Sequence, residues 1–331
     1  MTGQKRFLKK KMKKISTVFF GTHNFAATIL QGLIDSGLFD IQLVITQPDR
    51  PVGRKQEVQK SPVKLLAEKH NLQLAQPSSL KTFDFTDFKD FMDLGVVAQY
   101  GLIIPERVLN LPKMGIINVH TSLLPRYRGA SPIQTALMNG ETQTGVTIMK
   151  MDAGLDTGPI ILQKPLDIAE NDTYTTLDKK MAKIAVLGLL EAIPDYISGA
   201  LQPIPQDNSL ATHTKQLTRE DGRVDWQKTA QEIYNKWRGL TPWPGVWTTF
   251  KNRRVKLLKI KPVIDIKDIK DIGYWILKND KIIIRCSQDA IEIEELQVEG
   301  KNKQTAKEFI NGHPSLRGGL LPTKQSIRKH S

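Results

Sequence analysis

The sequence has almost no cysteine, and this scarcity excludes whole classes of protein. One cysteine, Cys286, stands in a chain of 331 residues, so no disulfide can form within the chain and a disulfide-stapled secreted fold is excluded. Paired-cysteine metal sites are excluded for the same reason, and His213 and His313 lack the spacing of metal ligands. We therefore expect a reducing, cytoplasmic location and no metal.

Long apolar runs are also missing. No run approaches the roughly 18 residues that a membrane helix needs, so we expect no membrane partner. The composition, 40% hydrophobic and 25% charged, is that of a globular protein. Because 331 residues exceed the usual size of one domain, two domains are the default expectation.

Two catalytic signatures are absent as well. The chain has no G-x-S-x-G nucleophile elbow. The stretch "FFGTHNFA" (19–26) follows an apolar run but does not complete G-x-G-x-x-G, which argues against a dinucleotide site. These absences leave acyl-type transfer without a protein nucleophile as the chemistry to look for.

Acidic residues are scarce in two parts of the chain. Residues 1–14 carry seven Lys or Arg and no acid, residues 15–206 have 17 basic and 19 acidic residues, and residues 207–331 have 24 and 15. A basic second part beside a nearly neutral first part is typical of a protein that holds a polyanion, although a solvated basic surface has the same composition. Residues 1–14 are predicted to be a disordered basic tail or the result of a misplaced start before Met12.

The first part of the chain has the pattern of an α/β fold. Short apolar runs at 16–21, 41–46, 94–100 and 115–120 alternate with helix-like segments, as buried parallel strands do. Two helices are predicted to begin with a Ser cap followed by Pro, at Ser61 and Ser131, and Gly140 is predicted to end the second. Strands over 144–151 and 158–166 and a helix over 173–198 complete a doubly wound, Rossmann-like sheet over 15–199.

The second part follows a predicted linker. Residues 200–221, "ALQPIPQDNSLATHTKQLTRED", lack apolar periodicity and contain two prolines. After a short helical segment near 229–239, the pattern changes to short β segments with turn residues between them. Residues 222–331 are therefore predicted to form a small antiparallel barrel.

The strand over 115–120 ends in two polar residues, Asn118 and His120. Side chains two residues apart on a strand point to the same side, and ligands of open α/β sheets bind beyond the carboxyl ends of the strands. A carboxamide and an imidazole that converge on one carbonyl oxygen can stabilise an oxyanion, and the His can also move a proton. A structural Asn and His that close a strand are the alternative interpretation.

Two aspartates stand among glycines in "MDAGLDTG" (151–158), between two predicted strands. Either Asp152 or Asp156 can return to His120 and orient its imidazole. The spacing does not choose between them, and a tight turn without a catalytic role has the same composition.

These residues resemble the formyltransferase family that uses 10-formyltetrahydrofolate, and within it the branch that formylates methionyl initiator tRNA. The resemblance rests on "NVHTSLLPRYRGASPIQ" (118–134) and "ETQTGVTIMKMDAGLDTGPI" (141–160). It extends over nearly the whole chain from about Lys14, through "TQPDRPVGR" (46–54), "DGRVDW" (221–226) and "PWPGVW" (242–247). It implies a Rossmann-like catalytic domain over 15–199, a linker over 200–221 and an OB-like tRNA-binding domain over 222–331.

The resemblance also implies roles for particular positions. Asn118, His120 and Asp156 match the family's catalytic trio, and Arg54 matches an arginine on the loop that meets the tRNA acceptor end. Arg126 and Arg128 can meet the glutamate tail of the folate or a tRNA phosphate, or simply be solvated. The segment that matches the folate-binding stretch consists of Ser122, Leu123, Leu124 and Pro125.

The chain departs from the family pattern at three positions and in one loop. His23 and Asn24 replace Pro and Asp, Thr121 replaces Gly, and the loop after Arg54 reads "KQEVQK", which is less basic than the family version. These changes leave the trio intact and put the acceptor-end contacts in doubt.

The reaction implied is transfer of the formyl group to the amino group of methionyl initiator tRNA during translation initiation, by a monomer that needs no metal. Two rivals remain: a sugar-nucleotide formyltransferase and a non-enzymatic RNA-binding protein. "GLDTG" (154–158), "DRPVGR" (49–54) and the basic barrel argue against the first, and the trio argues against the second.

Overall fold

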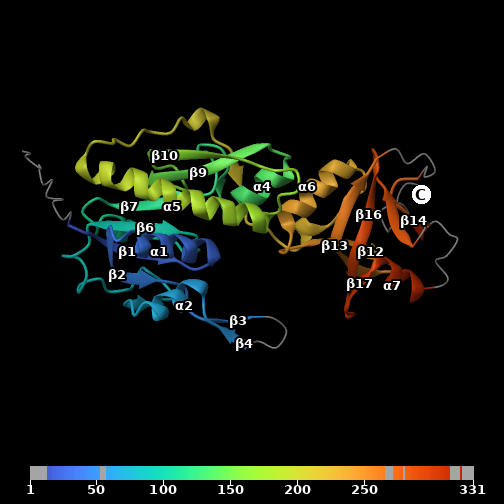
Figure 1. The fold of residues 1–331 in the computed structure, drawn as a ribbon, viewed down its shortest axis with the longest axis horizontal. Helices are drawn as coiled ribbons and strands as arrows, with labels where there is room; N and C mark the ends of the chain where they lie inside the picture. Colours follow the sequence, from blue (N-terminus) through green and yellow to red (C-terminus); the bar gives the residue numbers. More distant parts are fainter. Residues whose placement is uncertain (1–12, 53–56, 265–270, 279, 314–320, 323–331) are drawn as a thin grey trace, which may run out of the picture. The chain divides into compact units, whose positions relative to one another are not determined.

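The computed structural model describes residues 13–52, 57–264, 271–278, 280–313 and 321–322 (Figure 1). The chain divides into two compact units that do not follow chain order. The first unit takes its residues from 1–126, 145–165 and 179–211, and the second from 127–144, 166–178 and 212–331.

A seven-stranded sheet forms the centre of the first unit, with the order β10-β9-β7-β6-β1-β2-β5. The pairs β5–β2, β2–β1, β1–β6 and β6–β7 are parallel, and β9 is antiparallel to β7. Chain order reverses between β1 and β6, which is where ligands of doubly wound folds bind. The strands are β1 (Ile15–Gly21), β2 (Phe39–Ile45), β5 (Leu74–Ala75), β6 (Leu94–Ala98), β7 (Ile116–His120), β9 (Gln143–Lys150) and β10 (Ile160–Asp167).

Helices pack against this sheet through apolar faces. In α1 (Asn24–Ser36), the buried residues recur every three or four positions, so one side of the helix lies against the core. Gly32 of α1 is required by close packing, because a Cβ there would lie 2.4 Å from Cγ1 of Val186 in α5. The remaining elements associated with this unit are β3 (Arg50–Val52), β4 (Glu57–Gln59), α2 (Pro62–Lys69), α3 (Glu106–Leu109), α5 (Tyr174–Ser198) and η1 (Asn208–Leu210).

The second unit is built on an antiparallel sheet of order β12-β13-β16-β15-β14-β18, with β17 paired to β16. Its core contains the fully buried side chains of Trp226, Trp275 and Phe309. The remaining elements associated with this unit are β8 (Arg128–Gly129), α4 (Pro132–Met138), β11 (His213–Thr214), η2 (Glu220–Gly222), α6 (Ala230–Leu240), β12 (Val246–Phe250), β13 (Arg253–Val263), β14 (Tyr274–Lys278), β15 (Lys281–Arg285), β16 (Ala290–Val298), β17 (Lys303–Thr305), α7 (Ala306–Asn311) and β18 (Leu321–Pro322).

The predicted fold class, a Rossmann-like sheet with a second OB-like antiparallel unit, is confirmed. Ser61 caps α2 as predicted, since its hydroxyl accepts from the Lys64 amide at 3.0 Å. Ser131 occupies the N-cap position of α4 with Pro132 after it, as predicted, but its hydroxyl makes no capping hydrogen bond and donates to the carbonyl of Lys215 at 2.7 Å instead. The strand predicted over 94–100 ends at Ala98, because Gln99 adopts a left-handed φ of 41°.

Residues 1–12 of the predicted basic tail lie outside the described residues. Among the helices that are described, none combines the length and the apolar character needed to cross a membrane.

Candidate active site

Asn118 and His120 lie at the carboxyl end of β7, which is separated by β6 from the point where the strand order reverses. The side chain of His120 is buried, and the side chain of Asn118 is half-buried. Because the two residues alternate with the buried Val119, they share one side of the sheet. The predicted convergence of these two side chains therefore follows from the strand itself.

The carboxylate of Asp156 lies against both side chains. Its Oδ2 is 3.6 Å from Nδ1 of His120, and its Oδ1 accepts from Nδ2 of Asn118 at 3.5 Å. Both distances are at the long end of polar contacts, so small movements of the loop decide whether they tighten or break. The arrangement brings the three residues of the expected trio together, with Nδ1 as the ring nitrogen of His120 that faces the carboxylate.

The two aspartates that spacing left equivalent have different surroundings. Asp152 is exposed, and its Oδ1 accepts from the Gly154 amide at 3.0 Å and from Thr157 Oγ1 at 2.7 Å. These contacts belong to its own loop and form an Asx turn. Asp152 therefore shapes the connection between β9 and β10, while Asp156 reaches the end of β7.

The loop that carries Asp156 is held by a residue that the sequence did not reveal. Nε2 of Gln206 donates to the carbonyl of Asp156 at 2.9 Å and to that of Gly158 at 2.7 Å. Gly158 is itself required, because a Cβ there would lie 1.8 Å from the carbonyl oxygen of Lys150. A single amide in a proline-containing connection carries no periodic signal, and sequence spacing cannot identify it.

Thr147 of β9 holds the backbone of the segment "SLLP" (122–125) through two hydrogen bonds. Oγ1 of Thr147 donates to the carbonyl of Ser122 at 2.6 Å and accepts from the Leu124 amide at 3.0 Å. Gln163 of β10 donates to the Leu124 carbonyl at 2.8 Å and to Thr147 Oγ1 at 3.0 Å. These bonds give the backbone after His120 one defined shape.

The side chains of this segment point in different directions. The Ser122 hydroxyl donates to the carbonyl of Arg126 at 2.6 Å and is buried, and Leu124 is also buried. Leu123 and Pro125 are half-buried, and the bond between Leu124 and Pro125 is cis. Because the Ser122 hydroxyl is bonded to Arg126 and Leu124 is buried, the half-buried Leu123 and Pro125 are the side chains of this segment that a ligand can reach.

We expect Thr147→Val to destabilise the protein by about 1–3 kcal/mol, because it leaves buried backbone groups of Ser122 and Leu124 without partners. Urea unfolding measures this difference. Thr144→Val is the matched control on the same strand, since Thr144 Oγ1 is buried and has no hydrogen-bond partner among the described residues. Equal losses from the two variants would show that the network under "SLLP" adds nothing.

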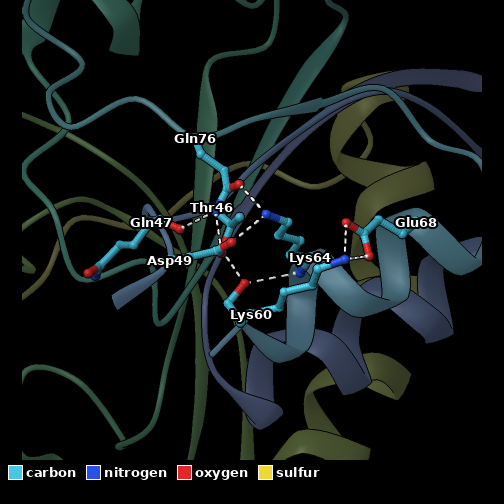
Figure 2. Close-up of polar contacts among 8 residues, drawn as sticks. Thr46, Gln47, Asp49, Lys60, Lys64, Glu68 and Gln76 are labelled. Atoms are coloured by element: carbon cyan, nitrogen blue, oxygen red, sulfur yellow. Dashed lines mark hydrogen bonds and ion pairs between the residues drawn. The ribbon is translucent and has the colours of Figure 1, made fainter. Parts of the chain in front are cut away.

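The base of the hairpin β3–β4 is held by a polar cluster (Figure 2). Lys64 of α2 donates to Asp49 Oδ2 at 2.5 Å and to Gln76 Oε1 at 2.8 Å, and Gln76 donates to Asp49 Oδ1 at 2.8 Å. Hydrogen bonds from Lys64 and Gln76 lower the pKa of the Asp49 carboxyl. The tip of this hairpin, with Arg54, lies outside the described residues.

The remaining positions that were predicted from the sequence lie outside the trio of Asn118, His120 and Asp156. Arg126 is exposed, while Arg128 is buried on β8, which pairs with β11 in the second unit. His23 precedes α1, and desolvation by its surroundings lowers the pKa of its imidazole. Asn24 is exposed, and Thr121 is buried next to His120. Within the described part of the chain, no three His, Cys, Asp or Glu side chains are grouped to hold a metal ion.

Asn118 and His120 at the end of β7 thus meet Asp156 from the loop between β9 and β10, and an amide and an imidazole placed in this way can donate hydrogen bonds to one oxyanion. The family model described as "Formyl transferase" matches residues 13–193, and that described as "Formyl transferase, C-terminal domain" matches residues 216–314. The chain belongs to the formyl transferase family.

Curated relatives match almost the whole chain. It is similar to the methionyl-tRNA formyltransferase of Caldicellulosiruptor saccharolyticus, with 41% identity over 92% of this chain and 99% of that protein. It is also similar to the methionyl-tRNA formyltransferase of Enterococcus faecalis, with 40% identity over 89% of this chain and 95% of that protein.

Solved structures share the fold at much lower identity. WlaRD, a sugar 3N-formyl transferase determined in the presence of dTDP and 5-N-formyl-THF, has 21% identity and a TM-score of 0.63, covering 88% of this chain and 100% of that chain. The N-formyltransferase from Helicobacter canadensis, in complex with folinic acid and dTDP-3-aminofucose, has 19% identity and a TM-score of 0.64, covering 84% and 98%. At such identities the likeness establishes the fold alone.

Proposed function

We propose that this chain transfers the formyl group of 10-formyltetrahydrofolate to the amino group of methionyl initiator tRNA, for translation initiation in the cytoplasm. The observation that carries the proposal is the Asp156 carboxylate lying against both Asn118 and His120. It stands in a chain about 40% identical, over nearly its full length, to methionyl-tRNA formyltransferases. The proposed substrates follow from these relatives, and the roles of the residues follow from the geometry.

In the proposed mechanism, the lone pair of the methionyl amine attacks the formyl carbon and forms a C–N bond. The carbonyl oxygen becomes an oxyanion, to which the Asn118 carboxamide and the His120 imidazole donate hydrogen bonds. Asp156 orients His120 and assists removal of the amine proton. The intermediate then collapses, the bond to N10 of the folate breaks, and N10 takes a proton as tetrahydrofolate leaves.

The donor is proposed to bind beside "SLLP", with 10-formyltetrahydrofolate as a cosubstrate and no metal. This segment follows His120 directly, so a ligand beside it has its reactive end near the trio. Arg126 is exposed at the end of the segment and carries a charge suited to the glutamate tail of a folate. Folate compounds in the solved relatives are consistent with such a donor.

The tRNA is proposed to contact the second unit through a surface that we call the Trp247 face, made of Arg223, Trp247, Arg254 and Lys256. The Arg254 guanidinium carbon lies 4.0 Å from the Trp247 ring centroid, and that of Arg223 lies 5.9 Å away. Lys256 is directly opposite Trp247 in the β12–β13 pair. Both guanidinium groups lie within cation–π distance of the indole, Arg254 much the closer, and planar guanidinium groups suit phosphate recognition.

Other lysines of the same sheet are already neutralised. Lys259 lies 2.7 Å from Glu294, and Lys261 lies 3.0 Å from Glu294 and 3.4 Å from Glu292. Hydrogen bonds and charge from these glutamates raise the pKa of Lys259 and of Lys261. On the Trp247 face, Arg254 is paired as well, since its Nη2 lies 3.0 Å from Glu220 Oε1. Among the described residues, Arg223 and Lys256 form no ion pair, so these two charges distinguish the face as a surface for a polyanion.

We expect the double substitution Arg223→Ala and Lys256→Ala to raise the KM for tRNA and to reduce its salt dependence. Each lost phosphate contact lowers the slope of log K against log salt by about 1. The double substitution Lys259→Ala and Lys261→Ala lowers the net charge equally and should change the slope much less. Steady-state kinetics at several salt concentrations measure both. A salt-independent KM, or equal effects of the two variants, would contradict the proposed surface.

Arg54 is proposed to meet the acceptor end of the tRNA, and the described contacts support only the base of its hairpin. The cluster of Asp49, Lys64 and Gln76 joins the start of the hairpin to α2. A fixed base would limit the directions in which the hairpin can extend. The role of Arg54 itself rests on the family match.

A sugar-nucleotide formyltransferase is the second candidate, because solved structures of such enzymes share the fold. The acceptor comparison separates the two functions: the protein is supplied with 10-formyltetrahydrofolate and with either methionyl initiator tRNA or a dTDP-amino sugar. Formylation of the tRNA alone is the expected result. Formylation of the sugar alone would replace the proposed acceptor, and turnover of neither would favour a non-enzymatic RNA-binding protein.

A further inference from the structure

Gln206 lies in the chain segment that follows α5 and contacts the loop between β9 and β10, which carries Asp156. Its Nε2 lies within hydrogen-bond distance of two carbonyl oxygens, those of Asp156 at 2.9 Å and Gly158 at 2.7 Å. A carboxamide nitrogen carries two hydrogens, so one side chain can satisfy both carbonyls. We infer that Gln206 is a positioning residue for formyl transfer, which holds Asp156 where its carboxylate meets His120 and Asn118. This inference rests on the proposed function.

The loop needs such a contact because its own conformation is unfavourable. Asp156 has φ 53°, in the left-handed region that residues with a Cβ rarely adopt, although Asp tolerates it better than most. Leu155 beside it is 64% exposed, so apolar packing does little to hold the tip of the loop. The hydrogen bonds from Gln206 to the carbonyls of Asp156 and Gly158, on either side of Thr157, add to the restraint that Asp152 supplies within the loop.

Gln206 is itself firmly placed. Two residues earlier, Ile204 exchanges two backbone hydrogen bonds with Ile160 at the start of β10, each of 2.8 Å. Within the first unit, the segment is therefore attached to the sheet just before Gln206 extends toward the loop. A rigid attachment is what a positioning residue requires, because a mobile one would not restrict its partner.

The contact matters for turnover because the polar contacts within the trio are already long, so the trio tolerates little further displacement of Asp156. Asp156 lies 3.6 Å from Nδ1 of His120 and 3.5 Å from Nδ2 of Asn118, so a further shift would leave no polar contact. Misplacement of a catalytic group by about 1 Å can cost about 10²-fold in rate. The effect should fall on kcat, since neither carbonyl that Gln206 holds belongs to "SLLP" or to the Trp247 face.

Gln206→Met tests the inference, because Met keeps the length of the side chain and removes the donor. We expect kcat to fall by about tenfold or more, with the KM for the folate donor little changed. Gln202→Met is the matched control from the same segment, since Gln202 Nε2 donates to Gly199 at 2.9 Å, outside the loop. Comparable losses in both variants would overturn the inference.

A double-mutant cycle with Asp156→Asn separates positioning from a general loss of structure. If Gln206 acts through Asp156, Gln206→Met should add little to the loss that Asp156→Asn already causes. Equal losses in the two backgrounds, or a silent Gln206→Met beside a damaging Asp156→Asn, would overturn the inference. A silent Asp156→Asn is a different failure: it would remove Asp156 from the proposed reaction, and the need to position it as well.

Gln206→Glu gives a second test that does not depend on Gln206→Met folding. An ionised carboxylate would face two carbonyl oxygens without a proton to donate, whereas a protonated carboxyl regains one donor. The activity of this variant relative to the unsubstituted protein should therefore rise as pH falls through the pKa of the new Glu. A constant activity ratio across pH would overturn the inference.

Discussion

His120→Ala and Asn118→Ala should each lower turnover by about 10² or more, which is the usual cost of losing one oxyanion donor. Both side chains lie at the carboxyl end of β7 on one side of the sheet, so each would reach the same developing charge. Folate binding should be largely kept, because the backbone of "SLLP" is held by Thr147 and Gln163 rather than by either residue.

The experiment measures kcat with methionyl initiator tRNA, and folate binding by equilibrium titration. His70→Ala is a suitable control, since Nε2 of His70 lies 3.1 Å from Oε1 of Gln31 in α1 and His70 takes no part in the trio. Near-normal turnover of both His120→Ala and Asn118→Ala would exclude the proposed oxyanion site. A loss of folate binding parallel to the loss of turnover would assign the two residues to donor binding.

Asp156→Asn should cripple the reaction, and Asp152→Asn should do so much less. The first substitution removes the charge that faces Nδ1 of His120, and we expect a loss of about 10² or more in kcat, on the scale of losing one catalytic contact. The second leaves an amide oxygen at Asp152 that can still accept from the Gly154 amide and Thr157 Oγ1.

The two variants are closely matched, because both lie in one loop and both remove one negative charge without changing the size of the side chain. Single-turnover rates at saturating substrates compare them without the influence of product release. Equal losses would show that neither carboxylate has a special place in the reaction. A larger loss from Asp152→Asn would mean that the shape of the loop matters more than the charge beside His120.

The sequence predicted most of what depends on local pattern. Apolar runs with few polar residues identified β1, β2, β6 and β7, because buried strands carry their signal within a few residues. The spacing of Asn118 and His120 placed both side chains on one side of a strand. Ser61 followed by Pro62 predicted the start of α2 for a similarly local reason.

The features that were missed depend on contacts between distant parts of the chain. Ser131 has the sequence pattern of a capping side chain, but its hydroxyl donates to the carbonyl of Lys215, 84 residues away. Gln206 and Asp156 are 50 residues apart, and nothing near Gln206 in the sequence indicates its partner. Asp152 and Asp156 have almost the same local sequence, and only the folded loop shows which of them reaches His120.

The most direct test of the account is whether the trio forms formylmethionine on tRNA. Methionyl initiator tRNA and 10-formyltetrahydrofolate are incubated with the protein and, separately, with Asp156→Asn; the tRNA is then deacylated and the released amino acid is identified by mass spectrometry. We expect formylmethionine with the unsubstituted protein, and far less of it with Asp156→Asn in the same time. Unmodified methionine from both reactions, or equal formylmethionine from both, would contradict it.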